Sequence, residues 1–340
     1  MKLDRTQRKS LVLVGVSLLV TVAVFSYLFS FITWGQVAEL IVSIDRRLLA
    51  LFFAISFSML LVRTMRYRVI LKSVGAYPGF LRLFLVVLVR GFCVDLLPAR
   101  TGELVYIYLL RVKLKVELGA ATASFALAFL FDMMALAPMI VLALFLVGAG
   151  LSLSWPVLAG AGVALFGFSA LLIHILIPGL RLAFGWSARL PDRWRKLRRW
   201  VRRFIAATHR QVFRARARGV YVPVFGWSVA VRLLKYGGLY VLLLAMLVPQ
   251  GYTLPDLPFP KVFLGFCAAE MAASLPISGI GGFGAYQGAW SLVFILLGFP
   301  AEMAKTTSVS HHVFSQMYGY AIGLIGLLAI LMVSARKPTR

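Results

Sequence analysis

The chain has 340 residues, of which 61% are hydrophobic and 14% charged, and its mean hydropathy is +0.91. Soluble globular domains are about 45 to 50% apolar, so this composition excludes an ordinary soluble domain and indicates a polytopic membrane protein. The net charge of +25 comes from 36 Lys and Arg against 11 Asp and Glu. These basic residues gather at the ends of apolar runs, which favours membrane topology and anionic lipid over nucleic acid. Two cysteines, Cys93 and Cys267, lie within apolar segments and predict neither a disulfide framework nor a metal site.

Several apolar runs are long enough to cross a bilayer, for which a helix needs about 20 residues. The first run follows a basic N-terminus and exceeds the roughly 7 to 15 apolar residues of a secretory signal. We therefore expect it to be an uncleaved span. The six predicted spans are residues 11–33, 48–71, 118–147, 156–180, 221–248 and 303–333.

Two further apolar segments are too short to cross and end at Leu97-Pro98 and Leu275-Pro276. Basic clusters at 63–72 and 111–115 flank the first segment, so the positive-inside rule predicts a hairpin that enters from the cytoplasm and returns to it. The second segment follows a loop, 248–260, that contains no Lys or Arg. We expect it to enter from the external side. With six full crossings, both termini are predicted to be cytoplasmic.

The predicted topology has an internal symmetry. The order span, span, hairpin, span covers about 11–147, and the same order covers about 156–333 in the opposite orientation. A weak sequence match supports it, because Gly91-Phe92-Cys93 and Gly265-Phe266-Cys267 each precede a Leu-Pro pair. Secondary transporters use inverted repeats with interrupted helices, whose exposed backbone groups line a polar site at the midplane. The prediction is an all-α membrane protein with one domain over 1–335, six spans and two re-entrant helical hairpins arranged as an inverted repeat.

Three stretches carry a resemblance to a known family. They are Arg63-x-x-Arg66-Tyr67, Leu97-Pro98-Ala99-Arg100-Thr101-Gly102-Glu103 and Leu275-Pro276-Ile277-Ser278-Gly279-Ile280-Gly281-Gly282-Phe283-Gly284. The chain resembles the flippase-like membrane domain of the lysylphosphatidylglycerol synthase family from about residue 10 to 335. The resemblance implies a lipid flippase or lipid-handling protein of the bacterial inner membrane. The best-known members flip an aminoacylated phosphatidylglycerol.

The chain departs from the best-known members of that family at two places. Those members carry a soluble synthase domain after the membrane part, and we expect none here because the sequence ends at Arg340. Members also often have an acid after the second glycine loop, where this chain has Ala285-Tyr286-Gln287. The second difference removes a candidate cation or proton site and leaves the identity of the lipid open.

Ionisable side chains at membrane depth cost roughly 2.5 to 3.5 kcal/mol on insertion scales, so they usually face a cavity or a partner. At the first hairpin tip, Arg100 and Glu103 predict a headgroup site, with Arg100 on phosphate and Glu103 pairing with an arginine or receiving an amine. Alternatively, they only hold the loop by binding an arginine of the 63–72 cluster. The glycines of the 279–284 loop lack a Walker A ending and are expected to allow close packing, or also to offer amides to a ligand.

Arg232 and Lys235 lie within the predicted span 221–248. They either snorkel to the cytoplasmic interface, or face inward to pair with Asp132 or Glu270 or to hold a lipid phosphate. The predicted substrate-binding residues are Arg63, Arg66, Arg100, Glu103, Asp132, Arg232, Lys235, Glu270, Gly281 and Gly282. No catalytic residue, metal site or cofactor is predicted.

The other ionisable candidates within the predicted membrane segments are Arg90, Asp95, Lys305, His311 and His312. Arg90 and Asp95 are about 140° apart on one helix, so each is expected to find a partner on another helix. His311 and His312 point about 100° apart and cannot both face one ligand. A hydrogen-bonded core role is expected for them, with proton coupling as the alternative.

A basic segment over 181–219 contains a single acid, Asp192. Its apolar residues recur at helical spacing, which predicts a helix with one apolar face and a crowded basic remainder. Such a helix is typical of a segment that lies on an anionic leaflet, either for anchoring or to recruit anionic lipid. The apolar residues are Trp194, Leu197, Val201, Phe204 and Val212.

These features predict a flippase or transporter for an anionic or headgroup-modified phospholipid or a polyprenyl-linked lipid, driven by an ion gradient or by the lipid gradient. The alternative is a membrane enzyme that uses Glu103 or Asp95 as general base on a lipid-linked substrate. Against it, the sequence contains no readable Ser-His-acid or metal-ligand cluster. A non-catalytic envelope scaffold and assembly into a homo-oligomer stay open.

Overall fold

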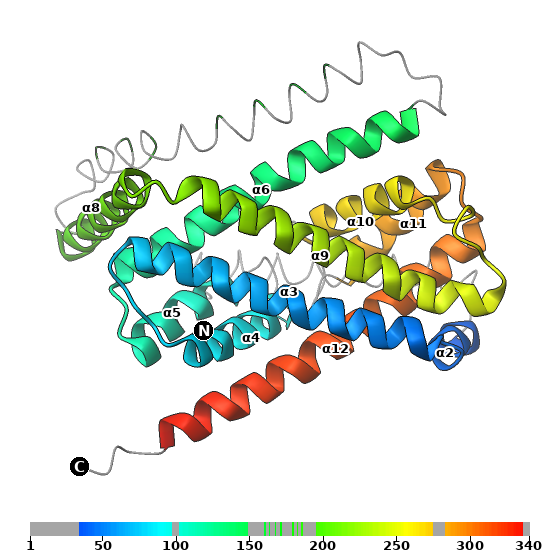
Figure 1. Cartoon of the computed structure of the whole chain (residues 1–340), viewed down its shortest axis with the longest axis horizontal. Coiled ribbons are helices and arrows are strands. Elements are labelled where there is room, and N and C mark those ends of the chain that lie inside the picture. Colours follow the sequence, from blue (N-terminus) through cyan, green and yellow to red (C-terminus); the bar gives the residue numbers. More distant parts are fainter. Residues whose placement is uncertain are drawn as a thin grey trace, which may run out of the picture. The chain divides into compact units, whose positions relative to one another are not determined.

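The computed structural model describes residues 34–96, 102–148, 195–274 and 283–335, with isolated positions between 160 and 185. Within those residues the regular structure is helical and no strand occurs, which confirms the predicted all-α class for the described chain (Figure 1). A short 3-10 turn, Val248–Gln250, follows α9. The α-helices are α2 (Trp34–Val42), α3 (Arg46–Ser73), α4 (Phe80–Leu96), α5 (Gly102–Leu114), α6 (Leu118–Gly148), α8 (Arg195–Ala217), α9 (Tyr221–Leu247), α10 (Phe259–Ala273), α11 (Ala285–Leu296) and α12 (Ala301–Ala335).

Four of the described helices are long and apolar enough to cross a membrane. They are α3, α6, α9 and α12, and they coincide with four of the predicted spans. The other two predicted spans, 11–33 and 156–180, lie outside the described residues. Helices satisfy all their backbone hydrogen bonds internally, which is why apolar runs of this length fold as helices in lipid. The protein is therefore a multi-pass membrane protein.

Each of the two Leu-Pro pairs lies in the sequence between two short helices. Leu97-Pro98 separates α4 from α5, and Leu275-Pro276 separates α10 from α11. Residues 97–101 and 275–282 between the paired helices lie outside the described chain.

A glycine sets the close approach in each of these helix pairs. A Cβ atom added at Gly265 would lie 2.1 Å from the ring of Phe294, so α10 and α11 pack tightly against each other. A Cβ added at Gly102 would lie 2.2 Å from the backbone of Cys93, which brings the start of α5 onto α4. Only a residue without a side chain fits at these two positions.

The chain divides into two compact units. Unit 1 consists of Met1–Ser56, Val89–Glu103 and Lys235–Ile325. Unit 2 consists of Phe57–Leu88, Leu104–Leu234 and Gly326–Arg340. Because these bounds fall within helices, α3, α4, α5, α9 and α12 each contribute residues to both units.

The core of unit 1 joins α3, α9 and α12. Phe52 packs with Leu242 and Met246, and Phe314 and Tyr318 cover this cluster. Large apolar and aromatic side chains at these contacts fill the space between the helices.

The start of α3 is fixed by Asp45, which acts as its N-cap. The backbone N–H groups of Arg47 and Leu48 both donate to Asp45 Oδ1, at 2.9 Å. The N–H of Asp45 donates in turn to the carbonyl oxygen of Ala245, also at 2.9 Å. The cap therefore satisfies two exposed N–H groups and ties the beginning of α3 to the end of α9.

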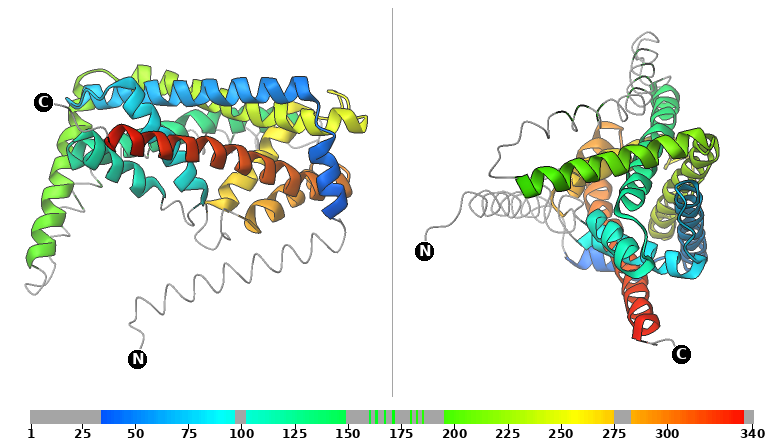
Figure 2. Two further views of the ribbon diagram at one scale, coloured as in Figure 1. Left: turned by 90° about the horizontal axis from the view of Figure 1, so that it is seen from below. Right: turned by 90° about the vertical axis from the view of Figure 1, so that its left-hand side faces the viewer.

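Unit 2 holds α3, α5 and α6 together through aromatic and small residues. The rings of Tyr67 and Tyr106 have centroids 4.6 Å apart, and the Tyr106 hydroxyl lies 3.1 Å from Ser124 Oγ. Farther along, α8 packs on α6, where a Cβ at Gly119 would come within 2.7 Å of Ala207. Figure 2 shows α8 running at a steep angle to the start of α9, which it precedes by a short turn.

Candidate functional site

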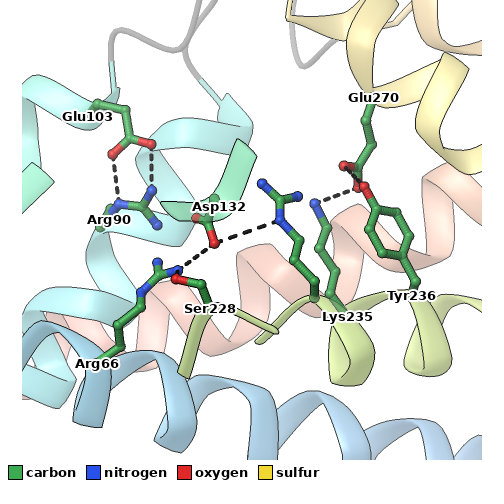
Figure 3. A network of polar contacts seen from close by, with 9 residues as sticks. Arg66, Arg90, Glu103, Asp132, Ser228, Lys235, Tyr236 and Glu270 are labelled. Atoms are coloured by element: carbon green, nitrogen blue, oxygen red, sulfur yellow. Dashed lines mark hydrogen bonds and ion pairs between the residues drawn. The ribbon is translucent and has the colours of Figure 1, made fainter. Parts of the chain in front are cut away.

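Unit 2 contains a buried cluster around Asp132 of α6. Arg66 of α3 is 1% exposed, and its Nη1 donates both to Asp132 Oδ1 and to Ser228 Oγ of α9, the latter at 3.1 Å. Figure 3 shows the Arg66 side chain reaching Asp132, with Ser228 beside its guanidinium group. The site forms because three helices each place one polar side chain on the face that packs against the other two.

Two more arginines act on the same carboxylate. Arg232, one helical turn beyond Ser228, places its Nε 3.7 Å from Asp132 Oδ1, which is an ion pair beyond ordinary hydrogen-bond distance. Arg63, one turn before Arg66, is half-buried and interacts electrostatically with Asp132. Two predicted arginines therefore pair with one predicted acid and a third acts on it electrostatically. The inward alternative for Arg232 is confirmed.

Unit 1 contains a two-armed ion pair between α4 and α5. Arg90 Nε donates to Glu103 Oε2 at 2.7 Å, and Arg90 Nη2 donates to Glu103 Oε1 at 2.5 Å. Such bidentate pairs are among the stronger hydrogen-bonded contacts of proteins. Glu103 also lies in the first turn of α5, where the helix dipole favours a negative charge. The pair confirms an arginine partner for Glu103 and a partner on another helix for Arg90. The alternative in which Glu103 binds an arginine of the 63–72 cluster is wrong for this contact, because Arg90 lies on α4.

A second pair in unit 1 joins α9 to α10. Lys235 Nζ lies 2.5 Å from Glu270 Oε1, and the Tyr236 hydroxyl donates to Glu270 Oε2 at 3.1 Å. Figure 3 shows both side chains reaching Glu270 from consecutive positions of α9. The ring of Tyr236 packs edge-on against Phe263, with centroids 4.7 Å apart. The inward alternative is therefore confirmed for Lys235 as well.

The adjacent histidines of α12 are buried and hydrogen-bonded. His311 Nε2 lies 2.9 Å from the carbonyl oxygen of Leu239, so it carries a proton and donates. Gln287 Oε1 accepts from the N–H of Gly284 at 2.8 Å, which turns its amide nitrogen toward His312 Nδ1, 2.7 Å away. His312 Nδ1 must then accept, so the ring is held in a neutral form. The expected core role of both histidines is confirmed.

Three predicted site residues, Arg100, Gly281 and Gly282, lie outside the described residues. Within the described part of the chain, no group of three or more His, Cys, Asp or Glu side chains is placed to hold a metal ion. The remaining predicted residues fall into the Asp132 cluster and the two ion pairs, as given above.

The sequence prediction missed Ser228 and Tyr236, which complete two of these groups. A repeated pattern could have revealed the Tyr. Val62-Arg63-x-x-Arg66-Tyr67 on α3 recurs as Val231-Arg232-x-x-Lys235-Tyr236 on α9. A search for internal repeats would have placed the two basic pairs, and the tyrosine after each, at equivalent positions.

The basic helix α8 uses its described apolar face for contact with the protein. Val212, predicted to face lipid, is buried, as are Ile205 and Ala215. The Gln211 amide donates to Glu117 Oε2 at 3.2 Å, just before α6 begins. Side chains at Trp194, Leu197, Val201 and Phe204 lie outside the described set. The exposed basic residues of α8 are Arg199, Arg202, Arg203, Arg210, Arg214 and Arg216.

Comparison with known proteins gives one match. The model of a protein family described as "Lysylphosphatidylglycerol synthase TM region" matches residues 12–323. No curated protein and no solved structure matches the chain.

Proposed function

The chain belongs to the lysylphosphatidylglycerol synthase TM family, and from this premise we propose that it is a flippase or transporter that moves an anionic or headgroup-modified phospholipid between leaflets. The observation that carries the proposal is the set of buried and partly buried ion pairs on helices of the membrane domain. They are the Asp132 cluster, Arg90 with Glu103, and Lys235 with Glu270. We place the protein in the bacterial inner membrane.

Ion pairs inside a membrane domain are an energetically unfavourable way to hold helices together. A charge at membrane depth costs several kcal/mol unless it is paired or reaches water, and apolar residues of similar size fill such positions at lower cost. A lipid headgroup that crosses the bilayer meets the same cost. Helices that carry charged side chains offer it a polar route while the acyl tails stay in the bilayer. This physical match supports lipid movement.

We propose further that the two halves form an inverted repeat with two re-entrant helix pairs. The order long helix, two short helices, long helix occurs as α3 to α6 and again as α9 to α12. The recurring basic-Tyr pattern on α3 and α9, and Gly-Phe-Cys on α4 and α10, support equivalent positions. With six spans and cytoplasmic termini, this arrangement suits alternating access. Cysteines introduced at Thr101 and Ser278 should label from opposite sides of the membrane, and labelling from one side would contradict the repeat.

We also propose that α8, within the basic segment 181–219, lies against the anionic cytoplasmic leaflet. This helix lies near the ends of three spans. Arg218 Nη1, just after α8, donates to the carbonyl oxygen of Lys72 near the end of α3, and the Gln211 amide donates to Glu117 just before α6. The span α9 starts at Tyr221, shortly after α8 ends. A helix at a steep angle to a span runs near the membrane plane. Its exposed arginines would then meet lipid phosphates at headgroup level.

Reconstitution tests the proposed function. Purified full-length protein in liposomes that contain tail-labelled fluorescent phosphatidylglycerol should speed the loss of inner-leaflet fluorescence to external dithionite, compared with empty liposomes. Replacing Arg90 by Ala should slow it, whereas the exposed Arg82→Ala should not. A wild-type protein that moves no lipid with or without a proton or sodium gradient, but converts a lipid-linked substrate chemically, would refute transport in favour of an enzyme.

A further inference from the structure

Unit 2 contains a cavity of about 310 Å³ between two loops. One loop, residues 74–78, follows α3, and the other, residues 114–117, joins α5 to α6. The volume lies at the lower end of the range for small-ligand sites, about 300 to 1,000 Å³, so it suits a ligand of the size of a lipid headgroup. None of the residues that line the cavity belongs to the ion pairs that carry the proposed function.

The cavity lies at the ends of two helices that are long and apolar enough to cross the membrane. The lining begins at Val74, directly after α3 ends at Ser73, and includes Glu117, directly before α6 begins at Leu118. A span ends where the hydrocarbon core meets the headgroups. Tyr77, which also lines the cavity, is 72% exposed, and an aromatic ring with a polar hydroxyl is typical of this level. A ligand in the cavity would therefore lie among the lipid headgroups.

Two opposite charges line this cavity. Lys115 and Glu117 are both exposed, and among the described residues no ion pair joins them to each other or to a third side chain. Instead, Glu117 Oε2 accepts from the amide of Gln211 on α8 at 3.2 Å. A neutral donor fixes the position of the carboxylate without cancelling its charge. The cavity therefore offers a cation and an anion to the same ligand.

The Gln211 side chain holds Glu117 at an energetic cost. It is buried, and within the described part of the chain its Oε1 has no hydrogen-bond partner. Turning the amide over would place this oxygen against the Glu117 carboxylate, so the observed orientation is the favourable one of the two. A buried oxygen without a partner is unfavourable, which indicates that the placement of the carboxylate matters.

The backbone of Lys115 is unfavourable as well. The helices α3 and α5 are each followed by a residue in the left-handed conformation, Gly75 with φ 84° and Lys115 with φ 55°. Glycine adopts this conformation without a steric cost, and it is the usual residue at such helix ends. Lys115 is the single non-glycine residue with a positive φ among those that the structure describes. A lysine therefore stands where glycine would be less strained, which indicates that its ammonium group has a use.

We propose that this cavity binds the headgroup of a phospholipid that carries a primary amine, with phosphatidylethanolamine as the simplest example. Lys115 binds the phosphate, Glu117 accepts from the ammonium group, and Tyr77 offers an aromatic face to the same cation. In the proposed topology this end of α3 faces the cytoplasmic leaflet. The inference goes beyond the proposed function, because the lipid is a resident ligand and binding requires no movement between leaflets.

The proposed contacts predict which lipids bind. A choline headgroup has no N–H to donate to Glu117, and a glycerol headgroup has no cation. Native mass spectrometry of the full-length protein in detergent measures the Kd for phosphatidylethanolamine, phosphatidylcholine and phosphatidylglycerol with identical tails. We expect phosphatidylethanolamine to bind more tightly than the other two by on the order of tenfold. Equal affinity for the three lipids would overturn the proposal.

A soluble competitor distinguishes a lipid from a free metabolite. O-phosphoethanolamine carries the same charged groups without tails, and at the lipid concentrations used it should not displace phosphatidylethanolamine. Displacement at equal concentration would show that the site takes a soluble ligand, which would overturn the assignment to a lipid.

A variant of the acid tests its role. Glu117→Gln should remove the roughly tenfold preference for phosphatidylethanolamine, and the exposed Glu39→Gln should keep it. The new amide oxygen still accepts from Gln211, so the variant is expected to fold, and its unfolding temperature without added lipid reports that. An unchanged preference in folded Glu117→Gln would exclude Glu117 from the site.

A variant of the lysine separates binding from stability. Lys115→Gly relieves the left-handed strain, so we expect a higher unfolding temperature without added lipid and, at the same time, weaker binding of phosphatidylethanolamine. A purely structural role of Lys115 would not move the two measurements in opposite directions. If Lys115→Gly binds this lipid as tightly as the wild type, the proposed contact with the phosphate is wrong. The proposed lipid transport stands in either case, because it rests on other residues.

Discussion

Arg90 and Glu103 form a two-armed ion pair, at 2.7 and 2.5 Å, that ties the beginning of α5 to α4. Both side chains are largely buried. Because α4 ends at Leu96 and α5 begins at Gly102, this pair and the close contact at Gly102 hold the end of α4 against the start of α5. The contact between α4 and α5 therefore depends on a side-chain interaction as well as on close helix packing.

Removing one partner of this pair should be costly. Glu103→Ala leaves a buried guanidinium group without its carboxylate, so we expect the free energy of unfolding to fall by about 3 kcal/mol. Thermal unfolding in detergent measures the change. The double variant Arg90→Ala with Glu103→Ala should lose less than the sum of the two single variants, because neither leaves a partner behind. A Glu103→Ala protein as stable as the exposed control Glu39→Ala would show that the pair contributes nothing.

The Asp132 carboxylate should be more important for stability than any arginine around it. Asp132→Asn removes the counterion of the fully buried Arg66, and we expect a loss of about 3 to 5 kcal/mol in the free energy of unfolding. Adding Arg66→Met should restore much of that loss, since the buried positive charge is then gone. If Arg66→Met brings no recovery in thermal unfolding experiments, the burial of that charge is not the cause.

The close packing of α10 on α11 predicts a steric effect at Gly265. Gly265→Ala places a methyl group where the ring of Phe294 lies, so we expect a loss of about 1 to 3 kcal/mol through overpacking. Gly237→Ala on α9 is the matched control, because its Cβ would meet nothing within 4 Å. Phe294→Leu should partly rescue Gly265→Ala in the same unfolding measurement. Equal stability of the two alanine variants would contradict the tight contact.

The basic face of α8 predicts a response to lipid charge. An environment-sensitive dye on Arg203→Cys should shift its emission when the full chain moves from nanodiscs of phosphatidylcholine to nanodiscs with added phosphatidylglycerol. Arg210→Glu with Arg214→Glu should weaken that shift, since each basic residue near an anionic surface contributes about 1 kcal/mol. Raising the salt concentration should weaken it too. An emission shift that does not change with the lipid charge would indicate that α8 contacts only the protein.

Hydropathy and charge by themselves determined which parts of this chain are membrane helices. The bounds of α3, α6, α9 and α12 follow from apolar runs that no other backbone conformation can satisfy in lipid, and Leu-Pro pairs marked the two breaks. The same reasoning selected Asp132, Arg232, Lys235 and Glu270 as the charges that need partners. Local sequence therefore sufficed for secondary structure and for the inventory of ionisable groups.

Only tertiary packing decided which of these charges meet. Asp132 and Glu270 were equally eligible partners for Arg232 and Lys235, because both acids lie in apolar segments and helical periodicity alone does not orient one helix toward another. In the structure Arg232 joins Asp132 and Lys235 joins Glu270. An ion pair depends on a few ångströms of separation, and that distance is set by helix rotation and by close contacts between helices, which are properties of the packed molecule.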